Sequence, residues 1–183
     1  NWKVQTEKEA LLGVSFTGVA DNNFLTPEQL RNSAKLVLDV NEKYAKKIGI
    51  NLAARTTCLK PEGTMSCVVG SSSGVHARYD DYYIRRVRMN KGDALTNYLQ
   101  SVVPSLVEDD LFSPTGVVVS IPQESPTGSI NRNQETASTL LDRVLKYNQN
   151  WVSAGHRSGA NNHNVSCTIN YKQEEVAELR ERM

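Results

Sequence analysis

The stretch PEGTMS, residues 61–66, combines a proline, a glycine and two hydroxyl-bearing residues in a pattern that could bind an anion. We expect it to follow a buried strand at residues 50–60 and to open a short helix at about 64–69. The N-terminus of a helix offers backbone N–H groups without intrahelical partners and the positive end of the helix dipole. Gly63 lets the backbone approach a ligand closely, and the neighbouring hydroxyls can donate hydrogen bonds. This chemistry suits a phosphate.

A purely structural interpretation of the same stretch is also open. Pro61 and Gly63 would then form a turn, and Thr64 would cap the helix. The phosphate-binding pattern GxxxxGK[ST] is absent, and a short glycine-containing loop is weak evidence by itself. Glu62 also argues against a bare phosphate site, because its carboxylate repels phosphate unless it points away or binds a sugar hydroxyl.

Other side chains with metal or thiol chemistry give weaker patterns. His156, His163 and Cys167 do not match the spacing of a standard zinc site and lack a fourth ligand, so we predict no metal site. Cys58 and Cys67 flank the 61–66 loop, where inert buried thiols are the default interpretation.

A basic run on a predicted strand is a second, weaker candidate for anion binding. Arg85, Arg86 and Arg88 could meet phosphates. On a strand, however, arginines more often pair with acids, and Asp80 and Asp81 lie close by in the sequence.

The helix expected at residues 27–48 has the clearest local signature. Thr26 and Gln29 fit a capping box, with Pro27 at the first helical position. Apolar residues then recur at helical spacing, and Gly49 fits a C-terminal cap.

The remaining elements are expected to alternate between strands and helices. Strands are predicted at residues 13–17, 50–60, 82–89, 115–122 (closed by Pro122) and 164–171. Helices are predicted at residues 64–69, 91–102 and 134–153 and in the charged segment KQEEVAELRERM. Such alternation indicates an α/β architecture with mainly parallel strands and connecting helices. About five strands are half of what a barrel needs, which suggests a fragment of a larger fold.

Composition narrows the class of protein. The chain has 183 residues, enough for one domain with a core. Its 21 Lys and Arg residues balance 20 Asp and Glu residues, so charge gives no pull toward nucleic acid or a membrane surface. No apolar run approaches the roughly 20 residues of a membrane-spanning helix. Three cysteines without CxxC spacing argue against a disulfide framework, so we expect a reducing, cytoplasmic location.

A longer stretch carries a family resemblance. The sequence ARTTCLKPEGTMSCVVGSSSGVHARYDDYYIRRVR, residues 54–88, resembles adenosylcobalamin-dependent (class II) ribonucleotide reductases, particularly the monomeric ribonucleoside-triphosphate reductases. That family has a K-P-S-G-T-x-S loop, then S-S-G-[IV]-H and Y-Y-I-R-R. The segments GVSFTG (13–18), NQNWVSAGH (148–156) and NHNVSCTI (162–169) are similar to family segments in the same order.

The resemblance implies a fold and a substrate-binding loop. The family fold is a ten-stranded α/β barrel made of two half-barrels, and residues 1–183 would be a single fragment covering the C-terminal half. By the family's K-P-S-G-T-x-S motif, Gly63, Thr64, Met65 and Ser66 would bind the substrate's phosphates. Glu62 replaces the motif's first serine, which removes one hydroxyl and adds a charge.

The resemblance also implies which parts of the chemistry lie elsewhere. The family's thiyl cysteine belongs to an N-x-C-x-E motif that does not occur in this sequence. We expect it upstream of Asn1, with the redox-relay cysteines beyond Met183. No catalytic residue is therefore expected within the chain, and the isolated segment would be inactive.

The implied activity is the conversion of ribonucleoside triphosphates to 2′-deoxyribonucleotides by thiyl-radical chemistry. Adenosylcobalamin would be the cofactor, and the partners would be the substrate, the remaining half of the barrel and a thioredoxin-type reductant. Two alternatives stay open: a stand-alone nucleotide-binding or regulatory module without radical chemistry, and a purely structural α/β domain in which PEGTMS is only a turn and a cap.

Overall fold

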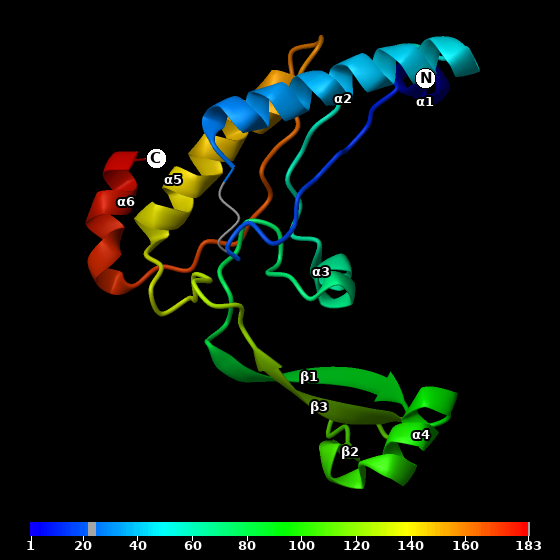
Figure 1. Cartoon of the computed structure of the whole chain (residues 1–183), viewed down its shortest axis with the longest axis vertical. Coiled ribbons are helices and arrows are strands. Elements are labelled where there is room, and N and C mark those ends of the chain that lie inside the picture. Colours follow the sequence, from blue (N-terminus) through cyan, green and yellow to red (C-terminus); the bar gives the residue numbers. More distant parts are fainter. Residues whose placement is uncertain (22–24, 183) are drawn as a thin grey trace. The chain divides into compact units, whose positions relative to one another are not determined.

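A computed structural model describes residues 1–21 and 25–182 (Figure 1). The chain divides into two compact units, one formed by Asn1–Arg78 with Thr127–Met183 and the other by Tyr79–Pro126. The first unit is built mainly of helices and irregular segments, and the second contains the sheet. Each unit is described by itself below.

The long helix of the first unit, α2 (Pro27–Ile48), confirms the strongest local prediction. The Thr26 hydroxyl accepts from the Gln29 N–H at 3.2 Å, and the Gln29 side chain accepts from the Thr26 N–H at 2.8 Å. These reciprocal bonds satisfy two N–H groups that a helix start otherwise leaves unpaired. At the other end, Gly49 adopts a left-handed φ of 76° and closes the helix.

The core of the first unit joins residues of α2, of α5 (Ala137–Tyr147) and of the turn after α5, and Figure 1 shows α5 slanting up to meet α2. Phe16 packs on Trp151 with ring centroids 4.4 Å apart, and the Trp151 indole N–H donates to the Cys58 carbonyl at 2.9 Å. Leu30 and Leu59 are fully buried beside them. Burying each side chain of this size contributes about 1.5–3 kcal/mol, so this cluster is the unit's principal source of stability.

The predicted helix at 134–153 is correct in its centre and differs at its ends. Thr136 caps α5, and after Tyr147 the chain continues as a π-helical turn, Asn148–Val152, and a 3-10 turn, Ser153–Gly155. The wider π turn buries Trp151 and Val152. Since π turns are rare and cost hydrogen-bond geometry, packing of these two side chains decides the backbone here.

Three shorter helices complete the first unit. They are α1 (Trp2–Glu9), α3 (Gly63–Val69) and α6 (Val176–Arg182), with a 3-10 turn at Gln173–Glu175. The short helix predicted at 64–69 and the helix predicted at the C-terminus are confirmed as α3 and α6. Within the described residues, no helix combines the length and the apolarity that crossing a bilayer requires.

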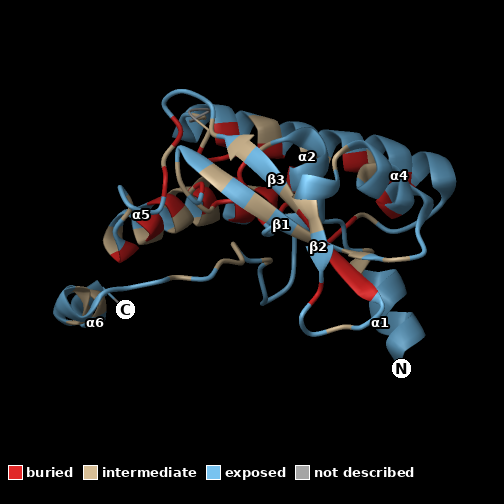
Figure 2. Ribbon diagram, turned by 90° about the horizontal axis from the view of Figure 1, so that it is seen from below, coloured by how far each residue is buried: buried red, intermediate tan, exposed pale blue. Residues whose placement is uncertain are grey.

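The second unit is a three-stranded antiparallel sheet with a helix in one connection. Its elements are β1 (Tyr82–Asn90), α4 (Ala94–Val102), a 3-10 turn (Pro104–Leu106), β2 (Val107–Asp109) and β3 (Gly116–Glu124), in the strand order β1-β3-β2. Figure 2 shows burial concentrated at the start of β3, where Val117, Val118 and Val119 lie. The strands predicted at 82–89 and 115–122 and the helix predicted at 91–102 are confirmed.

Pro122 does not close its strand as predicted. β3 continues to Glu124, and Pro122 lies opposite Ile84 of β1. Proline is tolerated where it removes no ladder hydrogen bond. Because β2 pairs only with Val117–Val119, the other edge of β3 is open at this position.

The prediction of a half-barrel with mainly parallel strands is wrong. Among the described residues, the sheet is antiparallel and lies within Tyr79–Pro126. The segments predicted as strands at 13–17, 50–60 and 164–171 form isolated bridges in place of strands, Val14 with Thr57 and Leu59 with Val165, and backbone hydrogen bonds flank these bridges.

Side-chain contacts explain why the segment at 50–60 is buried without becoming a strand. The Thr57 hydroxyl donates to the Trp151 carbonyl at 2.7 Å, and the Thr56 hydroxyl donates to the Gly155 carbonyl at 3.0 Å. The segment thus bonds to the end of the α5 region as well as to its extended neighbours. Its β-forming residues give burial and extension, but not a continuous ladder.

Replacing Gly155 by alanine should destabilise the first unit. A Cβ at this position would lie 2.7 Å from the Thr57 Cγ2 and 2.8 Å from the Thr57 Cβ, well inside van der Waals contact. Overpacking of a rigid site costs about 1–3 kcal/mol, which chemical denaturation would measure. Gly92→Ala is the control, because no atom lies within 4 Å of its Cβ position. Equal stability of the two variants would contradict this packing.

Candidate functional site

The predicted phosphate loop forms the start of α3. Glu62 adopts a left-handed conformation, with φ 56° and ψ 36°, and α3 begins at the next residue. A non-glycine residue in this conformation costs of the order of 1–3 kcal/mol, and such residues cluster at ligand sites. The turn leaves the N–H groups of Gly63, Thr64 and Met65 without intrahelical acceptors, since the first helical bond runs from the Ser66 N–H to the Glu62 carbonyl at 2.7 Å.

The predicted site residues share one turn but differ in exposure. Gly63, Thr64 and Met65 are exposed, Glu62 is partly exposed, and Ser66 is buried. The Ser66 hydroxyl donates to the Gly63 carbonyl at 3.0 Å, so it braces the turn from inside. No atom lies within 4 Å of the position that a Gly63 Cβ would take, so the backbone is open to a ligand there. The exposed hydroxyl is therefore that of Thr64.

The serine-rich segment that follows α3 supports the loop from behind. The Ser72 N–H donates to the Asp21 carboxylate at 2.7 Å, and the Ser72 hydroxyl accepts from the Ala20 N–H at 3.2 Å. The Ser73 hydroxyl donates to the Pro61 carbonyl. The Ser72 and Ser73 hydroxyls are thus engaged in hydrogen bonds within the chain. We call this serine-rich segment the brace, because it holds the loop in place.

Gly74 brings this brace into direct contact with the loop. It has a left-handed φ of 55°, and a Cβ there would lie 3.0 Å from the Pro61 Cα and 3.1 Å from the Lys60 carbonyl carbon. Only glycine combines this conformation with so close a backbone approach. The presence of glycine in the S-S-G-[IV]-H pattern is therefore explained by steric constraint.

A buried ion pair fixes both ends of the brace. The Arg78 Nε and Nη2 donate to the two Asp21 carboxylate oxygens at 2.8 and 2.9 Å, and Nη2 also donates to the Gly70 carbonyl at 2.7 Å. Both side chains are more than nine-tenths buried. Burial by itself would raise the pKa of Asp21, but the hydrogen bonds from Arg78 and Ser72 and the positive charge of Arg78 outweigh it and lower that pKa.

The residues considered as metal ligands contact backbone carbonyls. The His156 Nε2 lies 3.0 Å from the Gly159 oxygen, and the His163 Nε2 lies 2.7 Å from the Leu12 oxygen. Across residues 1–21 and 25–182, no three or more His, Cys, Asp or Glu side chains gather in a way that could hold a metal ion.

The thiols near the loop differ in environment. Burial raises the pKa of Cys58 and that of Cys167, which disfavours their thiolates. Cys67 is exposed, and its sulfur lies 3.1 Å from the Gly63 oxygen.

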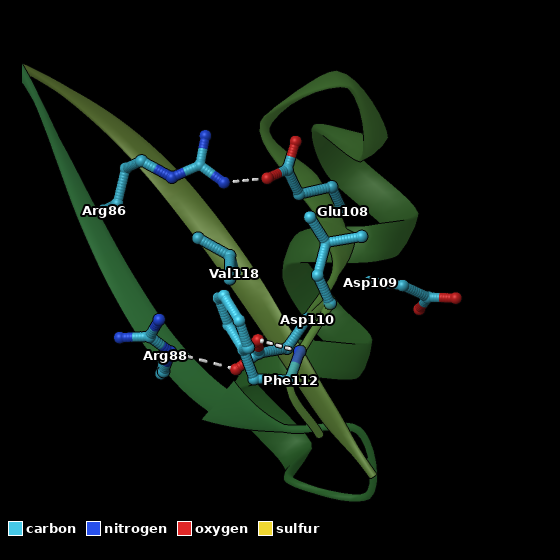
Figure 3. Close-up of a pocket in the computed structure, with 8 residues that line it drawn as sticks. Arg86, Arg88, Glu108, Asp109, Asp110, Phe112 and Val118 are labelled. Carbon is cyan, nitrogen blue, oxygen red and sulfur yellow. Dashed lines mark hydrogen bonds and ion pairs between the residues drawn. The ribbon is translucent and has the colours of Figure 1, made fainter. Parts of the chain in front are cut away.

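Two arginines of the basic run on β1, Arg86 and Arg88, face carboxylates of β2 and of the residue after it in a small pocket of about 240 Å³ (Figure 3). Arg86 pairs with Glu108, and Arg88 pairs with Asp110 at 3.0 Å. The acids paired with Arg86 and Arg88 are thus Glu108 and Asp110, which sequence reasoning did not single out. The carboxylates neutralise these arginines, which leaves little attraction for a phosphate.

Comparison with known proteins identifies the relatives of this chain. No family model matches it. It is 30% identical over 171 residues to a probable adenosylcobalamin-dependent ribonucleoside-triphosphate reductase of Dictyostelium discoideum, covering 87% of this chain and 20% of that protein. It is 29% identical over 141 residues to the adenosylcobalamin-dependent ribonucleoside-triphosphate reductase of Lactobacillus leichmannii, covering 77% and 18%. This chain is a homologue of the class II ribonucleotide reductases.

The solved structure of a relative agrees at the level of the fold. The crystal structure of a B12-dependent class II ribonucleotide reductase matches with a TM-score of 0.77 over 98% of this chain and 28% of that one. The two share 18% sequence identity, so this likeness concerns the fold alone. The chain spans about a fifth of the length of the curated class II reductases it matches.

Sequence reasoning missed the residues that support the loop. Asp21 and Arg78 are 57 positions apart and have no local pattern that joins them. His76 and Gly74 stood in the family motif, but only the contacts assign them a mechanical role. A left-handed residue at Glu62 was also unforeseen, since glutamate gives no signal for that conformation.

Substituting Asp21 by asparagine should destabilise the first unit by about 3 kcal/mol, because Arg78 would keep a buried charge without a countercharge. Since the folded pKa of Asp21 is lowered, its stabilisation is complete above the unfolded value near 3.9 and is lost as pH falls through the folded value. Denaturation between about pH 2 and 7 should therefore show a flatter acid limb for Asp21→Asn. Asp39→Asn, which breaks the exposed pair with Lys35, should cost under about 1 kcal/mol. An equal loss of stability in Asp21→Asn and Asp39→Asn would refute the stabilising role of the pair between Asp21 and Arg78.

Proposed function

We propose that this chain forms part of a ribonucleotide reductase that converts ribonucleoside triphosphates to 2′-deoxyribonucleotides by thiyl-radical chemistry. In this proposal, residues 61–66 bind the substrate's phosphates. The observation that carries it is the exposed first turn of α3, with unpaired N–H groups, inside a chain homologous to class II ribonucleotide reductases.

The loop would act by positioning the substrate. The N–H groups of Gly63, Thr64 and Met65 can donate to phosphate oxygens, and the Thr64 hydroxyl adds a further donor. Fixing the phosphates fixes the ribose, and a misplacement of about 1 Å can cost on the order of a hundredfold in rate. The internal braces at Ser66 and Ser73 support this role because they hold the turn without using its exposed N–H groups.

Glu62 would contribute its backbone conformation more than its side chain. Its left-handed turn presents the first N–H groups of α3 to solvent. Its carboxylate opposes phosphate binding through charge repulsion. In this proposal Glu62→Ser, which restores the family's residue, lowers the KM for the substrate.

The chain's own cysteines are not proposed as the radical site. Burial raises the pKa values of Cys58 and Cys167, and none of the three thiols stands in an N-x-C-x-E sequence. The hydrogen abstraction would use the thiyl cysteine of the remaining barrel half, and the delivery of reducing equivalents from a thioredoxin-type partner would use the relay cysteines expected beyond Met183.

The relatives are named as adenosylcobalamin-dependent, and that cofactor would supply the radical in a complete enzyme. Within the described residues, an apolar groove of about 650 Å³ lies between α5 and α6. Its lining consists of Leu141, Ile169, Tyr171, Val176, Leu179 and Arg180. This lining is almost wholly apolar and offers only the Tyr171 hydroxyl and the Arg180 guanidinium to the many amide groups around a corrin, so the groove does not fit the cofactor and we derive no step through it.

The test is Thr64→Ala combined with Ser66→Ala in the complete protein that carries this sequence. The pair removes one exposed donor and the internal brace, so the KM for a ribonucleoside triphosphate should rise severalfold or more. Steady-state kinetics would measure it, with Val68→Ala as the control because Val68 is exposed on α3 beyond its first turn. Unchanged KM in the double variant would remove the loop from the site. Saturable nucleotide binding without any reduction would favour a stand-alone binding module.

A further inference from the structure

We propose that His76 is a positioning residue that clamps the start of the phosphate loop. The inference rests on the proposed function of residues 61–66 and assigns a role to a residue outside that loop. The His76 ring lies between two backbone groups: its Nδ1 is 2.9 Å from the Ser73 carbonyl oxygen, and its Nε2 is 3.0 Å from the Thr168 N–H nitrogen.

The two contacts fix the tautomer of the ring. A backbone N–H can only donate, so the Nε2 of His76 must accept from Thr168. A neutral imidazole carries one N–H, which therefore lies on Nδ1 and donates to the Ser73 carbonyl. The ring thus connects the segment at Ser73 to the segment at Thr168, donating one hydrogen bond to the first and accepting one from the second.

On one side, the clamp reaches the phosphate loop through Ser73. The Ser73 carbonyl accepts from both the Nδ1–H and the backbone N–H of His76, each at 2.9 Å, and the Ser73 hydroxyl donates to the Pro61 carbonyl. Gly74 then packs against Lys60 and Pro61. The ring therefore restrains the residue that precedes Glu62, where the turn into α3 begins.

On the other side, the His76 ring bonds to Thr168. The residues just before Thr168 are hydrogen-bonded to Leu59 and Lys60, which lead into the phosphate loop. The Ser166 N–H donates to the Leu59 carbonyl at 2.8 Å, and the Leu59 N–H donates to the Asn164 carbonyl at 3.1 Å. The Lys60 ammonium also donates to the Asn164 side chain at 3.2 Å. Residues 59–61 are consequently held from two directions, and His76 closes this arrangement.

Variants at His76 separate its two bonds. His76→Ala removes both, so the KM for the ribonucleoside triphosphate should rise about tenfold while kcat changes less than about threefold. His76→Asn can still donate near the Nδ1 position, and His76→Gln can still accept near the Nε2 position, so each should recover part of the loss. Ser101→Ala is the control, because it removes one side-chain bond to the Tyr98 carbonyl in the second unit and should leave KM unchanged.

Equal KM values for His76→Ala and the wild type would overturn the clamp, as would a uniform loss of kcat in all three His76 variants. A purely structural histidine would lower stability without separating KM from kcat and without partial recovery by asparagine or glutamine. These measurements use the complete protein.

A spectroscopic test does not depend on the kinetics of a variant. Solid-state ¹⁵N spectra of the histidine-labelled complete protein at about pH 8, where an ordinary histidine is neutral, should show His76 as the Nδ1–H tautomer. His76→Asn assigns the signal by its disappearance. An Nε2–H tautomer for His76 would overturn the clamp. If the Nδ1–H tautomer is found but the Thr64 and Ser66 double variant binds substrate normally, the clamp stands and the phosphate-binding role fails.

Discussion

The geometry of the site depends on the buried pair between Asp21 and Arg78. The pair is bidentate, and its members are 57 positions apart. It fixes a serine-rich brace that has little apolar surface of its own to bury. A loop that must expose backbone N–H groups cannot be stabilised by its own burial. The restraint has to come from residues behind it, and here a charge pair with full hydrogen bonding supplies it.

In the first turn of α3, some polar groups hold the turn in place and others are exposed to a ligand. The Ser66 and Ser73 hydroxyls make internal bonds, whereas Thr64 and the first N–H groups face outward. The turn is entered through a left-handed Glu62. In the proposed function, the ligand of this turn is the substrate's phosphate.

Local signals in the sequence predicted the local parts of this account. The capping box at Thr26 and the glycine at position 49 defined α2, and a continuous run of β-branched residues defined β3. The short helix that opens at Gly63 was also predicted from residue types, whereas the phosphate-binding role of residues 61–66 came from the family resemblance. The parallel half-barrel was wrong because β-forming composition does not say whether a neighbour completes the ladder. At Thr57 only an isolated bridge to Val14 forms, and the side chain bonds to the distant Trp151 carbonyl. The pair of Asp21 and Arg78 was missed because it too joins residues far apart in the sequence.

The central claim is that the first turn of α3 binds the substrate's phosphates, and amide hydrogen exchange tests it most directly. The complete protein would be compared with and without a ribonucleoside triphosphate, following the N–H groups of Gly63, Thr64 and Met65. The account predicts slower exchange at these three amides on binding, with little change at Val68 and Val69 later in the helix. Protection elsewhere in the protein, with unchanged exchange at all three, would contradict it.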